Sequence, residues 1–209
     1  MATVAKVGEF VAVMPNIQTV ELTLRGLPGS LLVVHNFSEK AKQEIRDKQQ
    51  KKAKKAKEQR DPQAEFLANR YVDGRGRECV PITAIKKAIV SAAPALDDAK
   101  KTHLRQAIFV DSPTEPGAML IPVEKYDGSP ATGEFREDPV TLGMNIRGLA
   151  YRPGYAEWQC RVKIQYNVRM LSLEQLLALV DQAGWGIGIC EGRPEKSSAL
   201  GWGRFGRVE

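Results

Sequence analysis

Alternation of apolar and polar residues predicts several β-strands along the chain. The stretches IQTVELTLRG (17–26) and EWQCRVKIQYN (157–167) place apolar side chains at every second position, which is typical of a strand with one buried face. Shorter strands are predicted where apolar residues run together, at 30–36, 107–110, 119–123 and 139–142. A loop rich in Gly, Pro and Asp precedes the last of these, and we predict another loop between Arg136 and Arg152.

Helical spacing of apolar residues predicts two helices. In VPITAIKKAIVSAAP the apolar side chains recur every three or four residues, with Pro81 at the start and Pro94 at the end. In SLEQLLALVDQAG the spacing is the same. There Ser172 is expected to cap the first turn and Gly184 to end the helix.

The order of these elements indicates an α+β fold. Strand, helix, strand or strands, strand, helix and strand follow one another, which is the β-α-β-β-α-β order of a ferredoxin-like (RRM-like) domain. We expect residues 1–209 to form one such domain. A long basic insertion, helical or disordered, interrupts it at 38–62, and a glycine-rich C-terminal strand and loop complete it at 184–209.

Positive charge is concentrated in that insertion. The net charge is +6 at pH 7, and the range 39–60 contains ten Lys or Arg residues against four acids, so it carries the whole excess. The segment consists of good helix formers after a candidate cap at Ser38, but it has too few apolar residues to face a core or a membrane surface. Two interpretations stay open: a helix that binds phosphates, or a flexible solubilising insertion that orders only with a partner. The lysines expected to bind phosphates are Lys48, Lys51, Lys52, Lys54 and Lys55.

Composition argues against several other classes of protein. Three cysteines without a C-x-x-C pair, with only two histidines, do not suit a zinc site or a disulfide framework. No window approaches the roughly 18 to 20 apolar residues that cross a bilayer, and the first residues lack a signal-peptide pattern. We therefore expect a soluble, cytoplasmic protein with no membrane partner, no metal and no cofactor.

The C-terminal segment combines glycine, basic and aromatic residues. Glycines let a ligand approach main-chain N–H groups closely, and cations placed among them suit phosphate oxygens. The candidate cations are Arg193, Lys196, Arg204 and Arg207, with Arg147 and Arg152 as weaker candidates in the preceding loop. Trp185, Trp202 and Phe205 would either stack on unpaired bases or belong to the core.

Three segments resemble the RAMP superfamily, whose members include the RNA-binding backbone subunits of CRISPR effector complexes. They are LTLRGLPGSLLVVHN, VPITAIKKAIVSAA and GIGICEGRPEKSSALGWGRFGRV. The chain also resembles uncharacterised phage and prophage proteins that end in a similar R-P-E-K stretch, which implies a bacterial or phage-infected bacterial cell. The resemblance implies that Lys86 and Lys87 contact an RNA backbone, although Ala84 and Ala88 stand where the family usually has serine and glycine. It also implies a glycine-rich loop formed by Gly186, Gly188, Gly192, Gly201, Gly203 and Gly206.

Catalysis has little support in the sequence. Cleavage of nucleic acid needs carboxylates that hold a metal, or a general acid and base that are usually histidines. His35 ends an apolar strand and His103 lies in a polar stretch, so we expect both to be structural or surface residues.

The leading hypothesis is a non-catalytic binder of single-stranded RNA or DNA, largely independent of sequence. Like the subunits that it resembles, it would assemble side by side on the strand as a homo-oligomer or filament. Two alternatives stay open. One is a phage protein-binding module that mimics or inhibits a host CRISPR effector complex, and the other is a RAMP-type endoribonuclease with His35 or His103 as general base.

Overall fold

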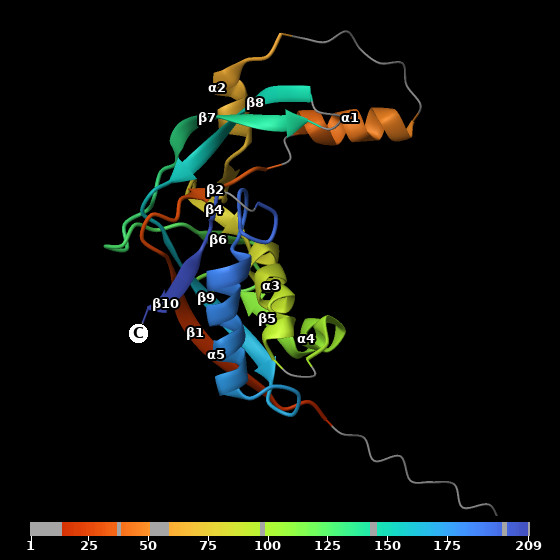
Figure 1. Ribbon diagram of the computed structural model, residues 1–209, viewed down its shortest axis with the longest axis vertical. Coiled ribbons are helices and arrows are strands. Elements are labelled where there is room, and N and C mark those ends of the chain that lie inside the picture. Colours follow the sequence, from red (N-terminus) through yellow and green to blue (C-terminus); the bar gives the residue numbers. More distant parts are fainter. Residues whose placement is uncertain are drawn as a thin grey trace, which may run out of the picture.

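The main sheet of the protein is antiparallel and has four strands (Figure 1). In the computed structural model, residues 14–36, 39–50, 59–96, 99–142, 146–197 and 200–208 are described. Across the main sheet the strands are β10 (Phe205–Val208), β1 (Ile17–Gly26), β9 (Gln159–Asn167) and β5 (Ile108–Asp111). The predicted α+β class is confirmed.

The strand register gathers apolar side chains on one face of this sheet. Val20 of β1 and Val110 of β5 both pair with Ile164 of β9. Helices α3 (Ile82–Ser91) and α5 (Leu173–Gln182) pack on the same face, as predicted from their apolar spacing (Figure 1). Their buried side chains, which complete the core, are Ile82, Ile85, Ala88, Ile89, Val90, Leu176, Leu179 and Val180.

Two smaller sheets lie at one end of the main sheet (Figure 1). One consists of β2 (Leu32–Val33), β8 (Ile146–Tyr155) and β7 (Glu134–Leu142), and the other of β3 (Tyr71–Val72), β4 (Glu78–Pro81) and β6 (Leu120–Pro122). The remaining helices and turns are α1 (Glu39–Gln49), α2 (Pro62–Ala68), η1 (Ala93–Ala95), α4 (Lys101–Ala107) and the π-helical turn η2 (Ala183–Ile187). None of the helices in the described ranges is long and apolar enough to cross a membrane.

The prediction of a loop between Arg136 and Arg152 is wrong. The described residues of this segment, 136–142 and 146–152, belong to the paired strands β7 and β8, which are in register from Glu134 and Gly154 onward and include the strand predicted at 139–142. Proline and glycine within the two strands weaken the alternation that normally identifies a strand. Cross-strand contacts stabilise the pairing instead, including a stack of Phe135 on Tyr151 with ring centroids 5.9 Å apart.

The predicted helix end at Gly184 is also wrong. The chain continues from α5 through η2, and the amide of Gly188 donates to the carbonyl of Ala183 at 2.8 Å. Gly188 has a φ of 71°, so this glycine ends the helical path. Gly184 is required for another reason, because a Cβ there would clash with the carbonyl oxygen of Phe205.

The basic insertion is described only in part. Its first half forms α1, which places Lys48 at an exposed position. Lys51, Lys52, Lys54 and Lys55 lie outside the described residues, together with Ser38.

Candidate nucleic-acid interface

A cleft of about 340 Å³ lies between α3 and the loop that follows η2. The helix side is formed by the segment from Pro81 to Ala88, and the loop side by the segment from Ile187 to Glu195. His35 and Tyr71 complete the lining, and the Tyr71 hydroxyl donates to the carbonyl of His35 at 3.2 Å. The cleft therefore joins the lysine-bearing helix to the glycine-rich loop, two segments far apart in the sequence.

The packing of α3 decides which of its two lysines faces the cleft. Pro81 precedes the first turn with an extended backbone, and Ile85 and Ile89 fix the buried face. Successive helical residues point about 100° apart. As a result Lys87 is exposed and lines the cleft, whereas the Lys86 ammonium lies 4.2 Å from the centre of the Phe109 ring, where burial lowers its pKa.

The glycines of the C-terminal segment mostly make room for the chain itself. A Cβ on Gly203 would clash with the carbonyl oxygen of Ile189, and one on Gly192 would clash with the Trp202 ring. The amide of Ile189 also donates to the carbonyl of Gly203 at 2.9 Å, which holds the two arms of the loop together. Gly201 has a φ of 61°, and the nearest atom to a Cβ there would be the Arg204 Cδ at 3.7 Å, so the loop is less crowded at this glycine.

Two of the predicted loop glycines lie in regular structure instead. Gly206 belongs to β10, where it pairs with Arg25 of β1. Gly186 is part of η2. The prediction that they belong to the loop is wrong because the helical path runs past Gly184 and the last strand begins at Phe205.

The cleft is lined by both basic and acidic side chains. Arg193 donates to the carbonyl of Cys190 at 2.7 Å and to the carboxylate of Glu195 at 3.1 Å, so it also fixes the loop. Glu191 lies 3.9 Å from the His35 imidazole and 3.7 Å from the guanidinium of Arg152. Within the described parts of the chain, Lys87 has no acidic side chain as a partner, which leaves its charge available to a phosphate.

Two titratable groups of the cleft are uncharged near neutral pH. Burial, then the nearby charge of Arg152, lowers the pKa of His35, while Glu191 acts in the opposite direction. Burial raises the pKa of the Cys190 thiol to about 12. A protonated thiol is a weak nucleophile, so the arrangement does not favour cysteine chemistry.

The other predicted side chains lie outside this cleft. Lys196 is exposed beside the loop. Arg207 makes two hydrogen bonds to Asp181 at 2.7 and 2.8 Å, and Trp202 is half-buried under the guanidinium of Arg136. The sequence analysis missed the role of Arg136, because its contact with Trp202 depends on the position of the β7–β8 hairpin.

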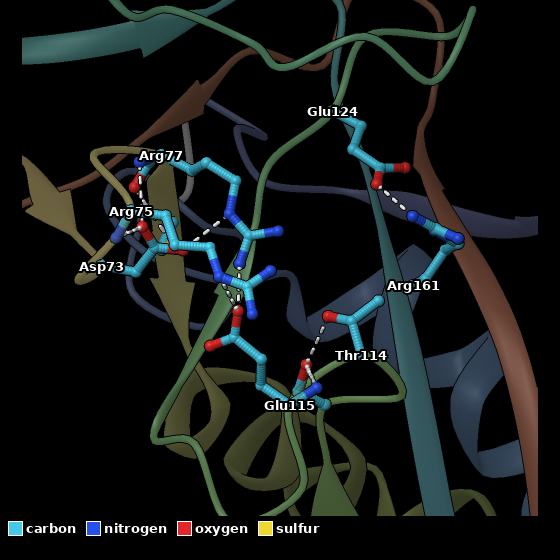
Figure 2. A network of polar contacts seen from close by, with 9 residues as sticks. Asp73, Arg75, Arg77, Thr114, Glu115, Glu124 and Arg161 are labelled. Carbon is cyan, nitrogen blue, oxygen red and sulfur yellow. Dashed lines mark hydrogen bonds and ion pairs between the residues drawn. The ribbon is translucent and has the colours of Figure 1, made fainter.

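A second cluster of charges lies where the loop after β3 meets the loop after β5 (Figure 2). Arg77 bonds to Asp73 at 2.7 Å and to Glu115 at 2.6 Å, and Arg75 lies 3.2 Å from Glu115. Nearby, Arg161 of β9 pairs with Glu124 at 2.6 Å. Every arginine labelled in Figure 2 has an acidic partner, so this cluster is a weaker candidate for binding a polyanion than the cleft.

Comparisons with known proteins include a distant similarity to a solved structure. No protein family matches the sequence, and no curated protein matches it. Among solved structures, the chain is similar to the crystal structure of Cmr6 from Pyrococcus furiosus, with a TM-score of 0.42 and 12% sequence identity. The similarity covers 93% of this chain and 100% of that chain.

Proposed function

We propose that this protein binds single-stranded nucleic acid, without cleaving it, along the cleft between α3 and the segment from Ile187 to Glu195. One observation carries the proposal. The two segments predicted from sequence to contact a phosphate backbone meet at one cleft, where Lys87 and Arg193 both line the surface. Lys87 supplies an exposed charge, and the adjoining loop is less crowded at Gly201 than at Gly192 or Gly203.

The strand order supports a ferredoxin-like domain as the scaffold. Along the chain, the elements of the main sheet and its two helices run β1, α3, β5, β9, α5, β10. Across the sheet the order is β10, β1, β9, β5. Numbered along the chain, these are the fourth, first, third and second strands of the sheet. The remaining elements are then insertions into this domain. The three sequence motifs favour a RAMP-like backbone subunit.

The concentrated charge of the insertion supports an extended polyanion as partner. A strand that crosses the cleft and reaches α1 would neutralise several phosphates, and release of their counterions makes binding strongly dependent on salt. Several copies side by side on one strand would bind cooperatively. A protein partner is the alternative that the same charge allows.

The proposal is tested by fluorescence anisotropy with matched RNA, single-stranded DNA and duplex oligonucleotides over a salt series. We expect preferential binding to single strands, with affinity that falls steeply as salt rises. Lys87→Ala should reduce the slope of log K against log salt by about 0.7. Lys86→Ala is the matched control: it removes the same charge beside Phe109, outside the cleft, and should change the slope less.

A variant with Lys51, Lys52, Lys54 and Lys55 replaced by alanine tests the insertion separately. Weaker binding by this variant would show that the insertion contacts the strand. If the wild-type protein binds none of the three oligonucleotides at low salt, the proposed function is wrong, and a protein partner becomes the better hypothesis.

Cleavage is a second candidate, because His35 lines the cleft and its lowered pKa keeps it in the neutral form that a general base needs. His103 is exposed on α4 instead. Incubation of end-labelled RNA with the wild-type protein separates the two functions. Intact RNA supports binding alone, whereas cleavage that disappears in His35→Gln and persists in His103→Gln would establish the endoribonuclease.

A further inference from the structure

Trp185 is a tryptophan that the fold leaves on the surface. Its side chain is 65% exposed on η2, and the guanidinium carbon of Arg204 lies 4.2 Å from the ring centre. The other tryptophans are placed differently: Trp158 is fully buried and donates to the carbonyl of Ser30, and Trp202 is half-buried. Core packing therefore explains Trp158 but leaves Trp185 without a structural role.

The backbone on both sides of this pair is held rigidly. Trp185 follows Gly184, which packs directly against the carbonyl of Phe205. The amide of Arg204 donates to the Ser30 hydroxyl at 2.7 Å, and its carbonyl accepts from Leu27 at 3.0 Å. An exposed ring on an anchored backbone loses little freedom when a ligand stacks on it. Single π-helical turns such as η2 are also rare and are frequent at functional sites.

The guanidinium of Arg204 forms no ion pair with an acidic side chain of the described residues. Arg193 bonds to Glu195 and Arg207 bonds to Asp181, whereas the side chain of Arg204 has no hydrogen bond or ion pair within the described ranges of the chain. Its Nε is buried and has no acceptor among the described residues. A guanidinium that covers one face of an indole and has no anionic partner offers a phosphate two further nitrogens.

We infer that Trp185 and Arg204 form a binding site for one unpaired nucleotide, whose base stacks on the open face of Trp185 while Arg204 binds the adjoining phosphate. The inference rests on the proposed function and deepens it. η2 supplies Trp185 to this site and Ile187 to the cleft, so both surfaces can follow one strand. Stacking on an aromatic ring tolerates any base, which agrees with binding that is largely independent of sequence.

The experiment compares two oligonucleotides of equal length, oligo-dT and the same strand with abasic sugars throughout, in anisotropy and tryptophan-fluorescence titrations. Trp185→Leu should bind oligo-dT about 5- to 150-fold more weakly than the wild-type protein, the range that loss of one stacked base predicts. Its affinity for the abasic strand should equal that of the wild type. Quenching of fluorescence by oligo-dT should disappear in Trp185→Leu and remain in the control Trp202→Phe.

Arg204→Met tests the phosphate contact, because methionine keeps an apolar side chain beside the ring. This variant should bind both oligonucleotides more weakly and with a smaller salt slope. If Trp185→Leu binds oligo-dT as tightly as the wild type does, the stacking site is wrong while the proposed function stands. If the wild-type protein binds neither oligonucleotide at low salt, the proposed function and this site both fail.

Discussion

Neighbouring residues of one type have different surroundings in this protein. Lys86 and Lys87 are equivalent in the sequence pattern, yet the first contacts Phe109 of β5 and the second lines the cleft. The sequence could not show that Lys86 would contact Phe109, since Phe109 belongs to another element. The two motifs that contain Lys87 and Arg193 could be identified from the sequence, but their meeting at one cleft could not.

Gly201 and Gly203 also have different surroundings, and the difference should appear in the free energy of unfolding of their alanine variants. Their φ values are 61° and 66°, so alanine at either position would incur the cost of a left-handed backbone, about 1 to 2 kcal/mol. Gly203→Ala also clashes with the carbonyl of Ile189, whereas the nearest side-chain atom to a Cβ on Gly201 is 3.7 Å away. Urea denaturation should show a loss at least about 2 kcal/mol greater for Gly203→Ala. Equal losses would contradict the close packing of the loop.

At the scale of elements, the helices and strands with a long amphipathic pattern could be predicted from the sequence, and several of those with a short or interrupted pattern could not. β1, β9, α3 and α5 have long amphipathic patterns and lie where the sequence predicts them. Helix α4 was missed because it has seven residues and buries only Leu104 and Ala107. Of the β7–β8 hairpin only the strand at 139–142 was predicted, because Pro and Gly hide the rest of its pattern, although its ladder is continuous.

The start of α5 is a feature that sequence and structure agree on. The Ser172 hydroxyl accepts from the amide of Gln175 at 3.2 Å, and the Gln175 side chain accepts from the amide of Ser172 at 3.0 Å. Ser172→Ala should lower the free energy of unfolding by about 1 kcal/mol, because the amide of Gln175 loses its acceptor. Chemical denaturation measures the change. Ser172→Asp keeps an acceptor and should be close to wild type, so a loss as large as that of the alanine variant would contradict the capping role.

At the scale of the whole molecule, a buried carboxylate connects the two smaller sheets. Glu78 of β4 accepts from Arg70 at 3.0 Å, from the hydroxyl of Tyr155 at 2.6 Å and from the amide of Gly133 at 2.8 Å. Burial, then the bond to Glu78, raises the pKa of Tyr155, so this hydroxyl stays protonated and donates. The carboxylate thus fixes the base of the β7–β8 hairpin against β4.

Removing the positive charge of Arg70 from beside Glu78 should lower the free energy of unfolding. Arg70→Met leaves Glu78 charged with only neutral donors, and we expect a loss of about 2 to 3 kcal/mol, below the range for fully buried pairs because Arg70 is partly exposed. Tyr155→Phe should lose about 1 to 2 kcal/mol. Urea denaturation measures both losses. The double variant Arg70→Met with Glu78→Gln should recover part of the first loss, and the absence of any recovery would indicate that packing of the Arg70 stem matters more than charge.

The position of β1 between β9 and β10 has a consequence for synthesis of the protein on the ribosome. β1 is the first strand of the main sheet to be made, yet both strands that pair with it belong to the segment from Gln159 to Val208. Pairings between distant parts of a chain form slowly, and an unpaired strand is open to association with other chains. During synthesis, β1 therefore cannot form its native backbone hydrogen bonds with β9 and β10 until these two strands have left the exit tunnel.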